Sequence, residues 1–415
     1  MKKFILFFLI FTTAILLVSC IPGQGTDDNG DTSGQIVINT LVNNSKTNVE
    51  FFAYKDGKSG TWSKLTGSSG KYTFTPEADD GNYSVFVVYE YYNEYQDKYG
   101  YEIELINTNK SELTALNVNF EDWSLETNPA TININFSNEF IDKYTAMFYG
   151  IYHGFPSLSS SEDLSYEFMV NNSTKDFAIT TTTDYDDFHD SIYIDRDLVV
   201  SGEITKNITI SDFFTLESFI ATSTIEGANA WSELLIGGET LVFPYLEGNN
   251  SAKLPDSISN ASDLYILEVS KSESGLNRYF YKYKNTVSDT EYLNTLPSDT
   301  WAEPTLTNDA SEVSLSWDSY DSEITGHETR AYKIGFQSID YWRTWNITNT
   351  TGWLGSSVSY EYNMPDLNGL SGWQDTWYPE NVTGFGSFSA ISSNNSNLAF
   401  YFNPIDGYEY SEIIY

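Results

Sequence analysis

Residues 71–74 read Lys71-Tyr72-Thr73-Phe74, and residues 80–85 read Asp80-Gly81-Asn82-Tyr83-Ser84-Val85. In both segments apolar side chains alternate with polar ones, which is the pattern of a half-buried β-strand. Asp80-Gly81-Asn82 favours a turn, because glycine accepts backbone angles that strain other residues, and Asp and Asn bond to nearby backbone. The sequence therefore predicts a strand, a turn, and a second strand from Tyr83 to Tyr89.

The same pattern occurs a second time further along the chain. Tyr72-Thr73-Phe74 and Tyr83-Ser84-Val85 recur as Tyr166-Glu167-Phe168 and Phe177-Ala178-Ile179, both with an offset of 94 residues (166 − 72 = 94). Aromatic and aliphatic positions agree while polar positions differ, as expected where only a buried face is kept. The sequence therefore predicts two copies of one β-unit.

Two flanking matches extend the copies. Asn117–Trp123 matches Asn207–Phe213 with an offset of 90 residues (207 − 117 = 90), and Ile36–Ile38 matches Ile132–Ile134. The apolar residues in these segments alternate with asparagines, which indicates one buried face and one solvated face. That arrangement is typical of an antiparallel sheet packed against a second sheet.

These motifs resemble a known family of domains. A glycine-rich turn, Lys71–Phe74 and then Asp80–Val85 resemble the G-x-Y-x-F…G-x-Y-x-V core of carboxypeptidase-regulatory-like, prealbumin-type β-sandwich domains. The resemblance covers roughly residues 34–123, with a second, more divergent copy behind it. It implies structural or carrier modules of envelope proteins that do not catalyse reactions. We expect β-sandwich repeats at 35–124 and 129–213.

The pattern changes after Phe214. We expect residues 214–300 to form a less regular β region. Residues 301–415 are expected to form a further domain, with an early strand at Val313-Ser314-Leu315-Ser316-Trp317-Asp318. With Tyr360–Leu367 behind it, this segment resembles a fibronectin-type-III or immunoglobulin-like domain, followed by a Trp-rich extension. The predicted fold class is all-β, with tandem antiparallel β-sandwich domains of the Ig-like and prealbumin-like kinds.

The amino terminus has the composition of an export signal. Lys2 and Lys3 precede an apolar stretch from Phe4 to Val18, and Leu17-Val18-Ser19-Cys20 follows the pattern of a cleavage site. The apolar stretch is too short for a membrane span, which needs roughly 17–25 residues. The pattern resembles a bacterial lipoprotein lipobox, although an ordinary signal peptide with a chance cysteine remains an alternative.

This resemblance implies a location. We expect a signal peptide at 1–19, a lipidated Cys20, and a flexible Gly- and Asp-rich linker over 20–34. The membrane is then a partner through the lipid anchor. Ile21, rather than an aspartate, follows the cysteine, which favours the outer membrane or cell surface of the bacterial envelope.

The charge balance excludes several classes of partner. The chain has 58 acidic residues against 21 basic ones, for a net charge of −37. Nucleic-acid binding needs basic patches, and anionic lipid surfaces attract lysine and arginine. A strongly acidic chain favours neutral or basic partners.

Tryptophan is concentrated near the carboxyl terminus. Seven of the ten tryptophans fall in residues 301–415. Aromatic rings beside polar side chains suit the flat C–H face of a sugar, but large aromatic residues also dominate cores. The candidate residues for binding a polysaccharide or another envelope protein are Tyr341, Trp342, Trp345, Trp353, Trp373 and Trp377.

One acidic loop offers oxygen ligands for a metal. Asp184, Asp186 and Asp190 are weak candidates for a Ca²⁺ site, because calcium takes six to eight oxygen ligands. No glycine follows at the turn position, and a solvated hairpin is the alternative. We expect no other cofactor.

The chain has no recognisable catalytic motif. It has neither H-E-x-x-H nor G-x-S-x-G. We therefore expect a binding or structural protein rather than an enzyme. The alternative is a secreted glycan hydrolase, because two distant carboxylates that meet only in the fold cannot be identified in a sequence.

Overall fold

The computed structural model describes residues 34–42, 45–93, 98–120, 129–136, 144–149, 152–154, 164–169, 174–182, 190–199, 202–237, 239–241, 250–273, 275–308, 313–338, 343–379, 382, 387–402 and 404–415. The predicted export signal and Cys20 lie outside these residues. Within them, no helix is both long enough and apolar enough to cross a membrane.

The fold is all-β, as the alternating patterns predict. The described residues form strands β1 to β30 and four single-turn helices. These helices are η3 (Ile210–Asp212), α2 (Thr351–Leu354), η4 (Asp375–Trp377) and α3 (Ala399–Phe402).

Residues 35–124, called copy 1 below, form two packed sheets. The first contains β2 (Ser45–Lys46), β1 (Ile36–Val42), β5 (Lys71–Phe74) and β8 (Ala115–Phe120). The second contains β4 (Trp62–Lys64), β3 (Phe51–Asp56), β6 (Asn82–Asn93) and β7 (Lys98–Asn109). Ile38, Val85 and Leu116 meet in the core between the sheets.

Residues 129–213, called copy 2, have the same strand pairing. One sheet contains β12 (Leu164–Met169), β9 (Pro129–Phe136) and β15 (Glu203–Ile208). The other contains β11 (Tyr152–Gly154), β10 (Tyr144–Tyr149), β13 (Thr174–Thr182) and β14 (Ser191–Val199), and β16 (Phe214–Thr215), just beyond residue 213, pairs with β14 at its edge. In each copy the first strand lies between an antiparallel neighbour, β5 or β12, and a parallel one, β8 or β15. The repeat in sequence is therefore also a repeat of topology.

The first strands of the two copies align differently through their two neighbours. Through the antiparallel neighbour, Tyr72 lies opposite Ile38 and Tyr166 lies opposite Ile132, which gives an offset of 94 residues (132 − 38 = 94). Through the parallel neighbour, Asn117 lies opposite Asn39 and Asn207 lies opposite Asn135, which gives an offset of 96 residues (135 − 39 = 96) and agrees with the match of Ile36–Ile38 with Ile132–Ile134. The two offsets differ by two residues, so every side chain stays on the same face.

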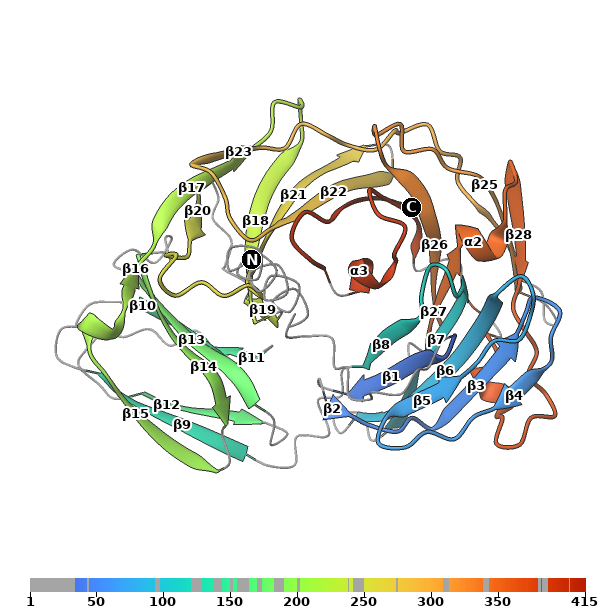
Figure 1. The fold of residues 1–415 in the computed structure, drawn as a ribbon, viewed down its shortest axis with the longest axis horizontal. Helices are drawn as coiled ribbons and strands as arrows, with labels where there is room; N and C mark the ends of the chain where they lie inside the picture. Colours follow the sequence, from blue (N-terminus) through green and yellow to red (C-terminus); the bar gives the residue numbers. More distant parts are fainter. Residues whose placement is uncertain are drawn as a thin grey trace, which may run out of the picture.

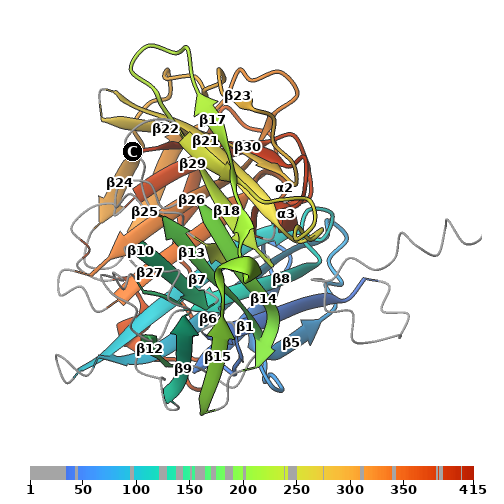
Figure 2. The ribbon, with the colours of Figure 1, turned by 90° about the vertical axis from the view of Figure 1, so that its left-hand side faces the viewer.

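Residues 214–300, the middle region, also form two layers. One sheet contains β20 (Asn250–Lys253), β17 (Glu217–Thr222) and β23 (Thr290–Tyr292). It packs against β18 (Asn229–Ile236), β19 (Glu239–Leu241), β21 (Leu264–Glu273) and β22 (Leu276–Lys284). Ala178 and Ile192 of copy 2 join this core, so copy 2 lies against the middle region (Figure 2).

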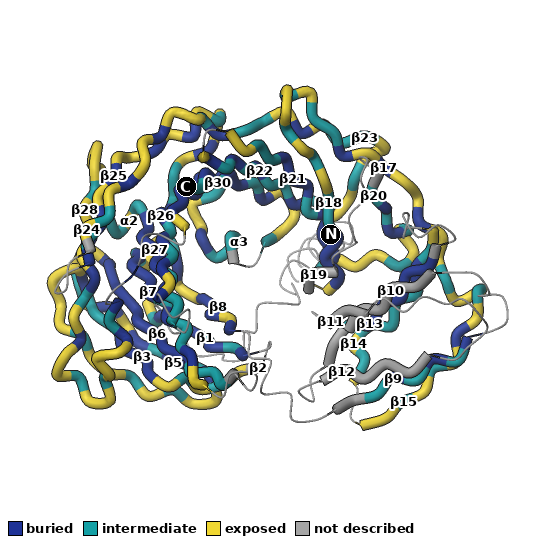
Figure 3. Tube along the Cα trace, turned by 180° about the vertical axis from the view of Figure 1, so that it is seen from behind, coloured by how far each residue is buried: buried dark blue, intermediate teal, exposed yellow. Residues whose placement is uncertain are grey.

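Residues 301–415, the C-terminal region, form the largest core. One sheet contains β24 (Thr305–Asn308), β25 (Val313–Asp318) and β28 (Ser359–Asn363). The strands opposite are β26 (Glu328–Gln337), β27 (Arg343–Thr350), β29 (Ser387–Ser393) and β30 (Glu409–Ile414). Trp317 and Tyr332 lie between the layers, and the buried residues concentrate along these central strands (Figure 3).

One twelve-stranded sheet runs through three of these regions. Its order is β19-β18-β21-β22-β30-β29-β26-β27-β7-β6-β3-β4. The C-terminal region lies in the middle, with β30 antiparallel to β22 and β27 parallel to β7. The regions therefore follow one another around an arch (Figure 1).

Polar side chains bridge the β7–β27 pair on both faces of the sheet. Asn107 and Asn349 lie opposite each other, and Asn107 Nδ2 donates a hydrogen bond to Asn349 Oδ1 at 2.8 Å. On the other face, Asn346 Nδ2 donates to Glu104 Oε1 at 2.6 Å. Phe51 and Leu105 of copy 1 share one core with Trp345 and Trp377 of the C-terminal region.

We predict that Trp377→Ala destabilises both regions, because the indole lies in their shared core. The loss expected for a fully buried tryptophan is about 3–5 kcal/mol in the free energy of unfolding. Urea denaturation followed by circular dichroism measures it, with Val358→Ala, at a side chain 83% exposed, as control. In hydrogen exchange, protection of β6 and β27 is expected to fall together. A loss of protection confined to β27 would contradict the shared core.

Candidate functional site

The structure buries two of the predicted ligand-binding tryptophans. Trp345 and Trp377 are both 0% exposed. Trp345 Nε1 donates to the backbone oxygen of Trp377 at 2.8 Å, so the two residues fix each other inside the core. Their expected place on a binding surface is therefore corrected, because a ring without solvent-accessible area cannot stack on a ligand. They fill the space between the twelve-stranded sheet and the β24-β25-β28 sheet.

Trp373 is half-buried and packs edge-on against other rings. Its ring centroid lies 5.4 Å from that of Phe86 and 5.6 Å from that of Trp377. Tyr341 and Trp342 lie outside the described residues. Trp353, the last of the predicted set, is the one that lines a pocket.

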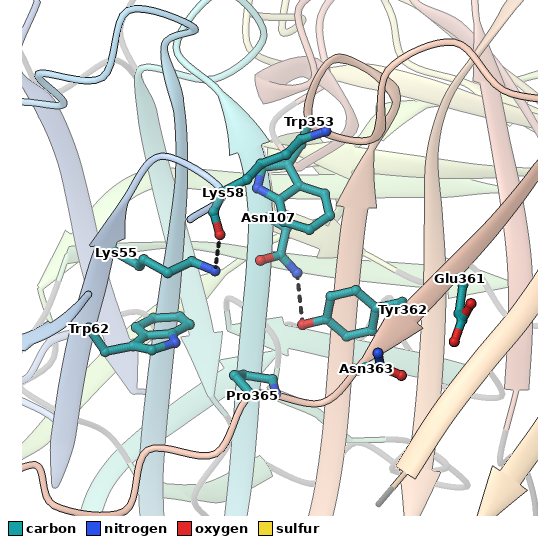
Figure 4. Close-up of a pocket in the computed structure, with 9 residues that line it drawn as sticks. All are labelled: Lys55, Lys58, Trp62, Asn107, Trp353, Glu361, Tyr362, Asn363 and Pro365. Carbon is teal, nitrogen blue, oxygen red and sulfur yellow. Dashed lines mark hydrogen bonds between the residues drawn. The ribbon is translucent and has the colours of Figure 1, made fainter. Parts of the chain in front are cut away.

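The pocket has a volume of about 170 Å³ and opens between copy 1 and the C-terminal region (Figure 4). It is lined by two tryptophans, two lysines, two amides, a tyrosine, a glutamate and a proline. These residues are Lys55, Lys58, Trp62, Asn107, Trp353, Glu361, Tyr362, Asn363 and Pro365.

Copy 1 holds the short helix α2 that carries Trp353. Glu112 accepts hydrogen bonds from the Thr350 hydroxyl and, at 2.8 Å, from the Gly352 backbone N–H. A Cβ at Gly352 would lie 2.5 Å from the Glu112 carboxylate, so a larger residue here would displace that carboxylate. At the other end of the helix, Lys58 Nζ donates to the Leu354 carbonyl at 3.1 Å. Trp353 is therefore positioned by residues 241 and 295 positions earlier in the chain (353 − 112 = 241 and 353 − 58 = 295).

Each tryptophan of the pocket has a lysine over its ring. Lys55 and Trp62 lie opposite each other in the β3–β4 pair, and Lys55 Nζ is 5.4 Å from the Trp62 ring centroid. Lys58 Nζ is 5.1 Å from the Trp353 ring centroid. Both distances suit a cation–π contact. The pocket wall therefore holds two pairs, each made of a tryptophan ring with a lysine ammonium over it.

Asn107 and Tyr362 form a buried polar floor. Asn107 Nδ2 donates to the Tyr362 hydroxyl at 3.1 Å in addition to its bond with Asn349. Burial raises the pKa of Tyr362, so its phenol stays protonated at neutral pH. The phenol therefore has its own proton to donate.

The charged groups of the pocket are separated in space. Lys55 and Trp62 lie on one side, and Glu361 and Asn363 lie on the other, with Asn107 and Tyr362 between them (Figure 4). Burial lowers the pKa of the Lys55 ammonium. Its Nζ donates to the Lys58 carbonyl at 3.0 Å. On β28, Glu361 and Asn363 are exposed while Tyr362 between them is buried, so their side chains lie on the other face of the strand. The site therefore has a basic end, an aromatic wall and a polar floor.

The predicted calcium loop lies mostly outside the described residues. Asp184 and Asp186 are among those not described, and Asp190 is exposed, with its backbone carbonyl accepting from the Leu216 N–H at 3.0 Å. Over the described ranges, no group of three or more His, Cys, Asp or Glu side chains is placed to hold a metal ion. The calcium site stays a prediction.

Sequence reasoning missed Trp62, Lys55 and Asn107. All three belong to copy 1, whereas the search for binding residues followed the tryptophan-rich carboxyl terminus. Trp62 carried one usable signal, because it lies next to Thr61 and Ser63 in a polar stretch with few apolar neighbours. Such a tryptophan is a candidate for the surface.

No known protein family and no curated protein matches the sequence. Two solved structures that resemble the chain are the Bacillus anthracis TIE protein and a Ca²⁺-stabilized adhesin that helps an Antarctic bacterium bind ice. The first is 11% identical over 62% of this chain, with a TM-score of 0.16, and the chain covers only 46% of it. The second is 10% identical, the match covers 86% of this chain and 94% of the adhesin chain, and the TM-score is 0.12. At these TM-scores neither likeness supports an inference about function.

We predict that Asn107→Ala destabilises the protein, because it leaves the Asn349 oxygen and the Tyr362 hydroxyl without their donor. An unsatisfied buried polar group costs about 1–3 kcal/mol. Tyr362→Phe is the matched control, since it removes the phenol and leaves the Asn107–Asn349 bond intact. Chemical denaturation of both variants measures the difference. Equal stability of the two variants would show that the Asn107–Asn349 bond contributes nothing.

Proposed function

We propose that the protein is a lipid-anchored, non-catalytic protein of the bacterial cell envelope that binds a polysaccharide in the pocket between copy 1 and the C-terminal region. The observation that carries this proposal is the convergence of Trp62 and Trp353 on one pocket whose remaining walls are polar. A sugar presents a C–H face that packs on an aromatic ring and hydroxyls that need hydrogen-bonding partners.

The size of the pocket supports a single ring of a polymer as ligand. Its volume of about 170 Å³ is below the roughly 300–1,000 Å³ of pockets for drug-sized ligands. A protein partner needs roughly 1,200 Å² or more of buried surface for a stable interface. A polysaccharide can place one residue in the pocket and extend from its open side, so we favour it over a second envelope protein.

The acids of the pocket support binding without hydrolysis. Most glycoside hydrolases flank the scissile bond with two carboxyl groups. Among the described residues that line the pocket, Glu361 is the single carboxylate. We therefore place the glycan hydrolase second, with release of reducing sugar as the outcome that would support it.

The anchor is part of the proposal. Lipidated Cys20, followed by the polar linker over 20–34, would tether the β-structure to the membrane. A stable anchor needs more than one acyl chain. Placement in the outer membrane or at the cell surface rests on Ile21. An aspartate at this position, directly after the lipidated cysteine, would favour retention of the lipoprotein in the inner membrane.

We predict that Trp62→Ala and Trp353→Ala each weaken glycan binding at least about tenfold, which is about 1.4 kcal/mol and within the range for a central aromatic contact. Saturable change of tryptophan fluorescence during titration with envelope polysaccharide measures the affinity. Trp231→Ala is the matched control, because Trp231 is 42% exposed and is not among the pocket-lining residues. An equal loss with Trp231→Ala would contradict the assignment of the pocket.

We predict that Cys20→Ser releases the protein from the membrane fraction, because serine has no thiol to acylate. Fractionation with metabolic labelling by a fatty acid measures both partition and lipidation. Thr26→Ala, in the linker, is the control and leaves both unchanged. A Cys20→Ser protein that stays in the membrane fraction would refute the anchor.

A further inference from the structure

We propose that the sugar bound in the pocket is a uronic acid residue within a mainly neutral glycan, with its carboxylate on Lys55. This inference rests on the proposed polysaccharide function and names the chemical class of its ligand. It begins from the charges that surround the pocket.

Lys55 and Lys58 differ from the lysines of this acidic chain that pair with carboxylates. Lys253, Lys282 and Lys284 form salt bridges with carboxylates at 2.5, 2.7 and 2.6 Å. Among the residues that the structure describes, neither Lys55 nor Lys58 forms a salt bridge, although the chain has 58 acidic residues. Two lysines without a carboxylate partner therefore meet in one pocket.

Lys55 is the better anion receptor of the two. Lys58 is exposed, donates to the Leu354 carbonyl, and interacts electrostatically with Asp80. Lys55 is half-buried, and its one described hydrogen bond is to the Lys58 carbonyl. An ammonium has three N–H donors, so two remain for a ligand. A carboxylate in the pocket would also restore the favourable solvation that burial removes from this ammonium.

The arrangement of ring and cation matches an acidic sugar. Lys55 Nζ lies over the Trp62 ring at 5.4 Å from its centroid, so a ligand that reaches the ammonium also lies close to the ring. A uronic acid carries its carboxylate directly on a ring carbon, adjacent to the C–H face that packs on an indole. Between the ring and β28, the Asn107 amide and the Tyr362 phenol offer hydrogen-bonding partners for the hydroxyls of the same sugar.

The overall charge limits how acidic the glycan is. A net charge of −37 opposes a polymer with a carboxylate on every residue. At physiological salt the Debye length is about 8 Å, so a single carboxylate in the pocket interacts mainly with the Lys55 ammonium. A polymer that carries one acidic residue among neutral ones gains this attraction and avoids repulsion of its other residues by the acidic surface.

The test is calorimetric titration of the detergent-solubilised full chain with three forms of one oligosaccharide. The forms carry a single uronate, the same residue with its carboxyl reduced to the alcohol, or a sulfate in place of the carboxylate. We expect the uronate to bind about tenfold or more tightly than the reduced form, which is the scale of one charge-assisted hydrogen bond.

The variants assign that preference to one side chain. Lys55→Met keeps the apolar stem over Trp62 and removes the charge, so it is expected to bind the uronate only as tightly as the reduced form. Lys55→Arg is expected to keep the preference, and Lys46→Gln, at an exposed lysine on β2, is the control. Affinity for the reduced form reports whether Lys55→Met still folds with an intact pocket.

The outcomes separate this inference from the function on which it rests. Equal affinity of the native chain for the uronate and its reduced form would overturn the inference and leave polysaccharide binding in place. Tight binding of the sulfated form without binding of the uronate would also overturn it. Absence of saturable binding with all three forms would count against the polysaccharide function itself.

Discussion

The parallel pairing of β27 with β7 is the contact on which the rest of the arrangement depends. Parallel strands need a crossover connection, and here the connection is the larger part of the chain. The pairing joins copy 1 to the C-terminal region in one sheet. It also completes the core around Trp345 and Trp377, and it brings α2 to Glu112 and Lys58. Without it, the pocket has only one of its two walls.

The local elements were predictable because they depend on short-range patterns. Alternation in Lys71–Phe74 and Tyr83–Tyr89 predicted β5 and β6, and the offset of 94 residues predicted a second unit with the same strand pairing. The order of strands across the twelve-stranded sheet was not predictable. Each strand alternates in the same way, and nothing in β7 alone indicates that its edge pairs with β27 rather than with a neighbour in sequence.

Of the residues that form the candidate site, one was predicted from the sequence, Trp353. Aromatic residues beside polar ones suggested a sugar, and Trp353 does line the pocket. The sequence could not separate it from Trp345 and Trp377, because burial depends on which layer covers a ring, and that layer comes from distant strands. The polar neighbours of Trp62 indicated a surface residue, but not a pocket, because the opposite wall of the pocket is contributed by the other end of the chain.

The distance between the two halves of the pocket has a consequence for biogenesis. Asn107 and Asn349 lie 242 residues apart, and a chain emerges from its amino terminus first. The edge of β7 has no β27 to pair with until residues 343–350 have been made. An open edge invites pairing with other chains, and long-range closure is slow. The twelve-stranded sheet therefore passes through an intermediate with an exposed edge, which is closed only when the last part of the chain is available.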